Sequence, residues 1–126
     1  MAKILYESSS IRSDCGVLYL TEGEACTLPF IFNIKSRGTD NQLFDYQIAE
    51  DDYVEFVIKQ HCHDVQTILK KSVTNISANT CVFSLTIDDM TKLQGTHFVM
   101  SATLYGKNDL KRVLIKQMPI VVQEVV

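Results

Sequence analysis

The amino-acid sequence predicts an all-β protein, an antiparallel β-sandwich of about seven to nine strands. Three observations lead to this fold class. Several segments alternate apolar and polar residues at period two, the connections are rich in turn-forming residues, and a length of 126 residues suits one domain with its own core. We therefore expect a single sandwich domain over 17–126, preceded by an N-terminal arm or short edge strand at 1–16.

The clearest strand is the segment around Pro29. Apolar residues occupy every second position there: Cys26, Leu28, Phe30, Phe32 and Ile34. The intervening side chains would point to the other side of the sheet, because successive strand residues face opposite sides. Pro29 has no N–H group for the strand ladder, so we expect it at a sheet edge or a bulge.

Further strands follow from the same alternation. It recurs in three segments: Val54, Phe56 and Ile58; Cys81, Phe83, Leu85 and Ile87; and Phe98, Met100, Ala102 and Leu104. One core between two sheets is predicted to contain Phe30, Phe32, Phe56, Phe83, Leu85 and Met100. The C-terminal stretch predicts a strand, a break near Pro119 and a last strand, and shorter strands are expected at 4–6 and 17–20.

Only the segment 88–94 is predicted to form a helical turn. In DDMTKLQG (88–95), Asp88 or Asp89 is suited to cap the N-terminus, and Met90 and Leu93 are spaced to face the core together. Gly95 is a typical stop signal. The other connections are turn sequences, as in KSRGTDNQ (35–42), so the helical part is one turn long.

Composition and charge exclude several classes of function. A net charge of −3 with scattered lysines offers no basic face for a nucleic acid. No apolar run approaches the roughly 20 residues of a membrane span, and the N-terminus lacks the apolar stretch of a secretion signal. We expect no nucleic-acid or membrane partner and folding in a cytoplasm. The cysteines, Cys15, Cys26, Cys62 and Cys81, form no C-x-x-C pair and are expected to stay reduced.

The stretch QHCHD (60–64) raises the question of a metal site. If the strand from Val54 continues, His61 and His63 share one face, roughly 6–7 Å apart, as two ligands of one metal can. A catalytic zinc needs a third protein ligand, however, and His97 is distant in sequence. The alternative, which we favour, makes 54–60 and 67–71 the arms of a hairpin with HCHD at its polar tip. We expect no metal, with His61 and His63 as the candidates if one binds.

No motif for catalysis or cofactor binding is present. The sequence has no Gly-x-Ser-x-Gly, its five glycines stand alone, and Cys62 would face away from the histidines beside it. Glu50, Asp51 and Asp52 lack the spacing of a calcium loop and indicate a solvated turn. We therefore expect no catalytic residue, no cofactor and a protein that is not an enzyme.

A sugar-binding module is another common role for a small sandwich, and it would need exposed aromatic side chains. The sequence has no tryptophan, and Tyr46, Tyr53 and Tyr105 are the tyrosines near predicted loops or strand ends. Single tyrosines at such places more often cover the rim of a core. A carbohydrate- or cell-surface-binding module, with a glycan as its partner, is therefore the alternative function.

The order of segments resembles a known family. The relevant segments are LTEGEACTLPFIF (20–32), DDYVEFVIK (51–59), TILKK (67–71), CVFSLTIDDMTKLQGTHFVMSATLY (81–105) and RVLIKQMPIVV (112–122). Together they resemble the immunoglobulin-like domain at the N-terminus of phage baseplate upper proteins and related small virion proteins. In that family an acidic-Gly turn leads to a D-x-V-x-F-x-[IV]-K strand, and a single helical turn precedes a later strand. Where the family has a tyrosine two positions after the glycine, this chain has His97.

The resemblance implies an antiparallel immunoglobulin-like β-sandwich and a non-enzymatic virion component, in the tail, the baseplate or an accessory capsid or fibre protein. Such a protein is made in the host cytoplasm and is localised to the virion, where it acts by protein–protein association. The expected partners are other virion proteins or further copies in a homo-oligomer. We expect the contacts to come from the termini and the loop at 35–52. In addition, PIVVQEVV (119–126) is an association hazard unless it is paired.

Overall fold

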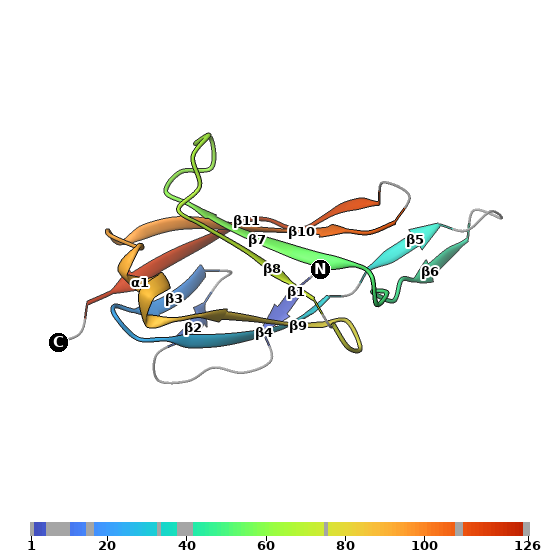
Figure 1. Ribbon diagram of the computed structural model, residues 1–126, viewed down its shortest axis with the longest axis horizontal. Coiled ribbons are helices and arrows are strands. Elements are labelled where there is room, and N and C mark those ends of the chain that lie inside the picture. The colour runs from blue at the N-terminus through green and yellow to red at the C-terminus, as the bar shows by residue number, and fades with distance from the viewer. Residues whose placement is uncertain are drawn as a thin grey trace.

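The computed structural model describes residues 2–4, 11–14, 17–32, 34–37, 42–74, 76–107 and 110–124. Strands make up most of the regular structure, with one short helix, so the predicted all-β class is confirmed. Two layers of strands run along the long axis of the molecule, and α1 lies at the same end as the last residues of β11 (Figure 1). Within the described residues, no helix is long and apolar enough to cross a membrane.

The described elements follow one another in this order: β1 Ala2–Ile4, β2 Ile11–Asp14, β3 Val17–Thr21, β4 Cys26–Phe32, β5 Lys35–Arg37, β6 Leu43–Asp45, β7 Tyr53–Lys59, β8 Leu69–Val73, β9 Thr80–Leu85, α1 Ile87–Thr91, β10 His97–Tyr105 and β11 Lys111–Gln123. The longer strands include every segment that was predicted from alternating residues: β4, β7, β9 and β10.

The strands form a three-stranded sheet in the order β1-β4-β9, a six-stranded sheet in the order β2-β3-β11-β10-β7-β8, and a hairpin of β5 and β6. All described pairs are antiparallel except β3 with β11, which is parallel and places Leu18 opposite Ile120. The prediction of a purely antiparallel sandwich was therefore wrong at this pair. Alternation fixes which face a residue points to, but it carries no information on the direction of the neighbouring strand.

The inward faces of the two sheets form one apolar core. All six residues predicted for it are buried: Phe30, Phe32, Phe56, Phe83, Leu85 and Met100. Phe56 of β7 stacks on Phe83 of β9 with 4.5 Å between ring centroids, and it lies 5.8 Å from the Phe30 ring of β4. These rings therefore join the two sheets, and each buried ring contributes about 1.5–3 kcal/mol through removal from water.

The junction between β9 and α1 differs from the prediction. Ile87, expected in the core, is exposed at the first helical residue, because β9 ends at Leu85 and Thr86 caps the helix. The Thr86 hydroxyl accepts the Asp89 N–H, and the Asp89 carboxylate accepts the Thr86 N–H. Thr86, not Asp88 or Asp89, is thus the N-cap of a reciprocal capping box. The helix itself is confirmed, although it ends at Thr91, before Gly95.

Strand β11 continues through Pro119, where the sequence predicted a break. Pro119 lies opposite Val99 of β10, and β3 begins to pair at the next residue, Ile120. The prediction of a break was wrong. Among the described strands Pro119 pairs with β10 alone, because the pairing of β11 with β3 begins only at Ile120. The irregularities lie instead at two register shifts opposite 100–103, which each add one residue to β11.

Short strands occupy the described parts of the N-terminal segment. β1 pairs with β4 and β2 pairs with β3, each at an edge of its sheet. The described pairing of β4 with β1 ends at Phe30, so Pro29 lies one residue beyond that ladder. At the other end of the chain, residues 120–123 are paired with β3, and residues 120 and 121 also with β10, so this part of the C-terminal run lies inside the sheet.

Candidate interaction surface

The outer face of β7, β10 and β11 carries aromatic and apolar side chains. In the ladder between β7 and β10, Tyr53 lies opposite Tyr105 and Lys59 lies opposite Val99. Tyr53 is 37% exposed, and Val113 of β11 is 60% exposed. A sheet that packs one face on a core usually turns polar side chains to water on the other. Tyr53 and Val113 are thus exposed aromatic and apolar side chains on a face that also carries Glu55, Ser101 and Thr103.

Tyr53, Tyr105 and Lys111 form a row across the three strands. The two tyrosine rings are stacked with centroids 5.3 Å apart, and the Lys111 ammonium lies 5.9 Å from the centre of the Tyr105 ring. Tyr105 is thus engaged from both neighbouring strands. A sugar ring would have to displace one of these partners to stack on Tyr105, so the row favours a structural role for that residue.

The QHCHD stretch lies in the connection 60–68 between β7 and β8, which confirms the hairpin interpretation. β7 ends at Lys59, so His61 and His63 do not continue its alternation, and the side-by-side arrangement expected for a strand is not formed. The His61 N–H donates to the Asp64 carboxylate at 3.0 Å, and the Asp64 N–H donates to the His61 carbonyl at 3.1 Å. This reciprocal pair turns the chain immediately after the strand.

The geometry of the loop bears on the metal candidates. His61, Cys62 and His63 are exposed. Among the residues that the structure describes, no three His, Cys, Asp or Glu side chains lie close enough to hold a metal ion. His97 lies apart, at the start of β10, where its Nδ1 is 2.7 Å from the Thr96 hydroxyl. The described part of the chain thus supplies no third ligand beside His61 and His63.

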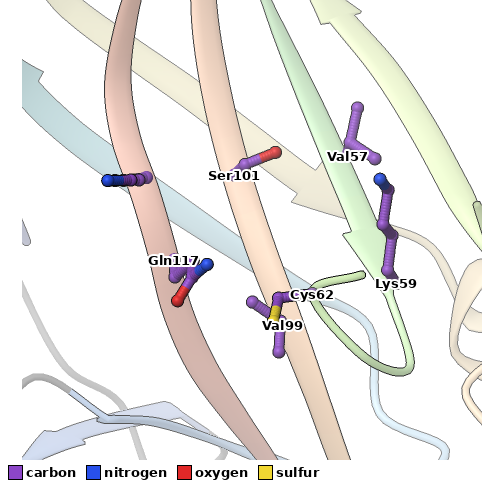
Figure 2. Close-up of a pocket in the computed structure, with 7 residues that line it drawn as sticks. Val57, Lys59, Cys62, Val99, Ser101 and Gln117 are labelled. Atoms are coloured by element: carbon purple, nitrogen blue, oxygen red, sulfur yellow. The ribbon is translucent and has the colours of Figure 1, made fainter. Parts of the chain in front are cut away.

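Cys62 lies over the outer face of the sheet. Figure 2 shows its side chain above Val99, with Lys59 on one side and Gln117 on the other. A hollow of about 180 Å³ is formed there by Val57, Lys59, Cys62, Val99, Ser101, Lys116 and Gln117. Within the described residues neither Lys59 nor Lys116 has an ion-pair partner, so the hollow is positively charged.

The described cysteines differ in accessibility. Cys26, Cys62 and Cys81 are all free thiols, while Cys15 lies outside the described residues. Burial raises the pKa of the Cys26 thiol to about 11 and that of Cys81 to about 12. Thiolate is the reactive form of cysteine, and a raised pKa makes this form scarce in Cys26 and Cys81. Cys62 is exposed and is therefore the accessible thiol among these three.

A second hollow, of about 440 Å³, lies between α1, the turn after β3 and the end of β11. Its apolar lining consists of Met90, Leu93 and Val122, each 4% exposed. Glu22 and Glu124 are exposed at its rim, and neither has an ion-pair partner within the described part of the chain. The hollow therefore has a polar, negatively charged rim above apolar side chains that already belong to the core.

Helix α1 is held beside this hollow by Lys71 of β8. The Lys71 ammonium forms an ion pair with Asp89 and donates to the Ser84 carbonyl of β9 at 3.2 Å. Burial alone would raise the pKa of Asp89, but hydrogen bonds from Lys71 and Thr86, together with the Lys71 charge, outweigh it and lower that pKa. The charged form of Asp89 is thus part of the folded state.

At the other end of the sandwich, Asp52 corrects the prediction of a solvated acidic turn. Glu50 and Asp51 are exposed, but Asp52 is 4% exposed. Its carboxylate accepts the Tyr46 hydroxyl at 2.6 Å and the Ala49 N–H at 2.9 Å. The hydrogen bond to Asp52 raises the pKa of Tyr46 to about 12. Tyr46, which packs against the core, therefore anchors a loop.

Asn79 is a second anchor that the sequence did not reveal. Its side-chain oxygen accepts the Ile48 N–H at 2.8 Å, and its amide donates to the Tyr46 carbonyl at 2.8 Å and the Phe32 carbonyl at 3.2 Å. Ala78 and Asn79 both have positive φ, 52° and 56°, as the central pair of a tight hairpin turn does. Asn in a turn signals such a backbone, but the partners are remote in sequence.

The residue of the β7–β8 loop that sequence reasoning missed is Val65. It is 96% exposed, within a loop of otherwise mostly polar residues. The available signal is an apolar residue directly after Asp64, which the sequence alone does not distinguish from an ordinary entry into the second arm of the hairpin. A single exposed apolar side chain is common on protein surfaces and by itself identifies no binding site.

Comparison with known proteins does not assign the chain to a family. No family model matches the sequence, and no curated protein is a significant match to it. The resemblance to phage baseplate proteins stays a prediction from the quoted sequence motifs.

Proposed function

We propose that the protein is a non-enzymatic interaction module of a phage virion, with an immunoglobulin-like β-sandwich, and that it acts by protein–protein association. The observation that carries the proposal is the outer face of β7, β10 and β11. Tyr53 and Val113 are exposed there beside the half-buried Val57 and Val99. Exposed aromatic and apolar side chains interspersed with polar ones, here Glu55, Ser101 and Thr103, are typical of a protein-binding surface.

The strand order supports the immunoglobulin-like part of the proposal. β4 and β9 are neighbours in one sheet, while β7, β10 and β11 are neighbours in the other, with β8 beside β7. Immunoglobulin domains place strands B and E together in one sheet and strands C, F and G in the other, and variable-type domains add C′ beside C. The virion assignment rests on the resemblance of the sequence motifs.

Strand addition at β8 or at the first half of β11 is a less suitable mode of association than contact through the face. β8 is short and carries Lys70 and Lys71, and the first half of β11 contains two bulges together with Lys111, Arg112 and Lys116. Lysines, short strands and bulges are the means by which natural sheets prevent pairing with another chain. We therefore place the partner against the outer face.

Particles of the phage that encodes the protein provide the test. We expect the protein to stay with the particles through a density gradient. A double variant, Tyr53→Ala with Val113→Asp, should fold but be lost from the particles. The matched control is Val82→Asp, which changes an exposed valine of β9 in the other sheet and should be incorporated normally. Native protein found only outside the particles would contradict the proposal.

Carbohydrate or cell-surface binding is the second candidate, and the partly exposed ring of Tyr53 is the observation that favours it. A glycan array distinguishes the two functions. Binding that is lost in Tyr53→Ala and retained in Val113→Asp would support the glycan function over protein association through the whole face.

A further inference from the structure

We infer that the outer face of β8, β7, β10 and β11 binds an extended acidic segment of another virion protein. This inference rests on the proposed function and deepens it, because it states the chemistry of the partner. Carboxylates of the segment meet lysines at both ends of the face, and its apolar side chains contact the valines and tyrosines between them.

Lysines that are scattered along the sequence are brought together on this face. The strand pairing and the hollow under Cys62 place four of them there: Lys59, Lys70, Lys111 and Lys116. The four strands, all of them described, contribute one carboxylate, Glu55, which lies 3.6 Å from the Lys70 ammonium. Four lysines and one glutamate give the face a charge of +3, whereas the whole chain carries −3.

Three of these lysines have no anionic partner within the described part of the chain: Lys59, Lys111 and Lys116. The Lys111 ammonium lies 5.9 Å from the centre of the Tyr105 ring, and this contact leaves its charge uncompensated. Asp64, the carboxylate of the neighbouring β7–β8 loop, accepts the His61 N–H. Unpaired positive charge on an otherwise acidic protein attracts acidic surfaces and repels basic ones.

The unpaired lysines lie at the two ends of the face. Lys111 lies opposite Tyr105 at the end of β10, and Lys59 lies opposite Val99 near its start. Val99 and Tyr105 are six positions apart, which corresponds to roughly 20 Å of strand. Val113 of β11 lies between these ends and is 60% exposed. The face thus presents positive charge on either side of an apolar centre.

This spacing favours a protein segment over a nucleic acid. A nucleic-acid strand carries a phosphate about every 3.4 Å, so most of its phosphates would lie over Val57, Val99 and Val113 without a cation. A protein strand that runs along β10 spans the same length with about six residues. It can place one carboxylate at each end and apolar side chains at alternate positions between them.

The hollow under Cys62 is the subsite for one of these carboxylates. Its volume of about 180 Å³ lies below the roughly 300–1,000 Å³ of pockets that enclose a small molecule, and it suits a single side chain. Lys59 and Lys116 supply positive charge there, and Ser101 and Gln117 supply hydrogen-bond donors (Figure 2). An aspartate or glutamate of the partner therefore meets both charge and donors at this end of the face.

Charge reversal in phage particles tests the inference. Lys111→Glu and Lys116→Glu each reverse one lysine, at opposite ends of the face. Lys92→Glu makes the same change of net charge at an exposed position after α1 and is the control. Particles should contain about tenfold less of either face variant and the normal amount of Lys92→Glu. Salt should release the native protein by screening.

If both face variants are incorporated as well as the control, the inference is overturned and the proposed function stands. The double variant Tyr53→Ala with Val113→Asp tests that function separately, because it removes the aromatic and apolar contacts and leaves every lysine of the face in place.

A carbodiimide cross-linker identifies the occupant, because it joins a lysine amine to a carboxylate only when the two are in contact. Native particles should yield peptides in which Lys59, Lys111 or Lys116 is joined to Asp or Glu of another virion protein. Links from these lysines only to further copies of this chain, or no links from them, would contradict an acidic segment of another protein.

A binding titration with purified protein separates the acidic segment from a nucleic acid. The probe is a capped peptide, Asp-Thr-Val-Ser-Val-Thr-Asp, and its control has Asn in place of both Asp residues. We expect the acidic peptide to bind more tightly than its control, and about tenfold more weakly to Lys111→Glu than to Lys92→Glu. Equal or absent binding of the two peptides, or tighter binding of single-stranded DNA with a steep salt dependence, would refute the inference.

Discussion

Lys71 and Asp89 form an ion pair that joins β8, an edge strand of the six-stranded sheet, to helix α1. Along the chain, α1 directly follows β9 of the three-stranded sheet. The same ammonium group donates to the Ser84 carbonyl of β9. One lysine thus connects both layers at the side of the sandwich where β8 and β9 are edge strands among the described residues.

The pair predicts loss of stability in acid. The folded-state pKa of Asp89 is lowered, so its contribution is fully present above the unfolded value, about 4, and is lost as the pH falls through the folded value. Asp89→Asn should reduce the free energy of unfolding at neutral pH and flatten its decline below pH about 4. Urea titrations at several pH values measure both effects. Asp88→Asn, at an exposed neighbouring position, is the control, and an equally steep acid decline in both variants would argue against the pair.

The Tyr46–Asp52 hydrogen bond predicts one late-titrating tyrosine. Because the folded-state pKa of Tyr46 is raised to about 12, its stabilising effect is present below the unfolded value, about 10, and is lost as the pH rises toward the folded one. Tyrosinate absorbance should contain one step with a midpoint near 12. Tyr46→Phe should remove this step and Asp52→Asn should lower its midpoint; an unchanged curve in Asp52→Asn would exclude the assigned cause.

Gly106 is predicted to tolerate no side chain. A Cβ at this position would lie 2.5 Å from the Asp52 carboxylate oxygen and 2.9 Å from Leu110. Gly106→Ala should therefore cost about 1–3 kcal/mol in the free energy of unfolding through overpacking. The same substitution in an Asp52→Ser background should cost less, since the shorter side chain leaves space. Equal costs in both backgrounds, measured by chemical denaturation, would mean that Asp52 is not the obstacle.

Phe83 is predicted to be essential for the contact between the sheets. It is buried and stacks on Phe56. Phe83→Ala should cost about 3–5 kcal/mol, a large part of the stability of a domain of this size. Val82→Ala, at the exposed neighbouring position, is the control and should change the free energy of unfolding by less than about 0.5 kcal/mol. A melting temperature of Phe83→Ala within a degree or two of the parent would contradict the packing.

The histidines of the β7–β8 loop are predicted to be dispensable for folding. The turn depends on the backbone of His61 and the side chain of Asp64, so His61→Ala with His63→Ala should cost less than about 1 kcal/mol. Asp64→Ala is the matched variant and should be more harmful to the loop. If a chelator lowers the melting temperature of the parent and has no effect on the double variant, a metal bound by these histidines becomes the better explanation.

The sequence predicted burial correctly where alternation within one strand decides which face a side chain points to. Phe30, Phe83 and Met100 were placed in the core because a strand exposes alternate residues to opposite faces. The burial of Asp52 was missed because it depends on contact with the remote Gly106 as well as on hydrogen bonds to the nearby Tyr46 and Ala49. Asn79 was missed because it donates to a residue remote in sequence, Phe32. The exposure of Val65 depends likewise on where the chain turns, and the Asp64 side chain sets that turn.

The parallel pairing of β3 with β11 has a consequence for synthesis of the protein. The two strands are separated by nearly the whole chain, and β11 is the last described strand to leave the ribosome. Until it emerges, β10 and β3 each lack the neighbour that lies between them in the finished sheet. Contacts of such high sequence separation form slowly, so during translation one edge of β3 and one edge of β10 lack a partner strand. Interrupted translation before residue 120 should therefore yield aggregation-prone fragments.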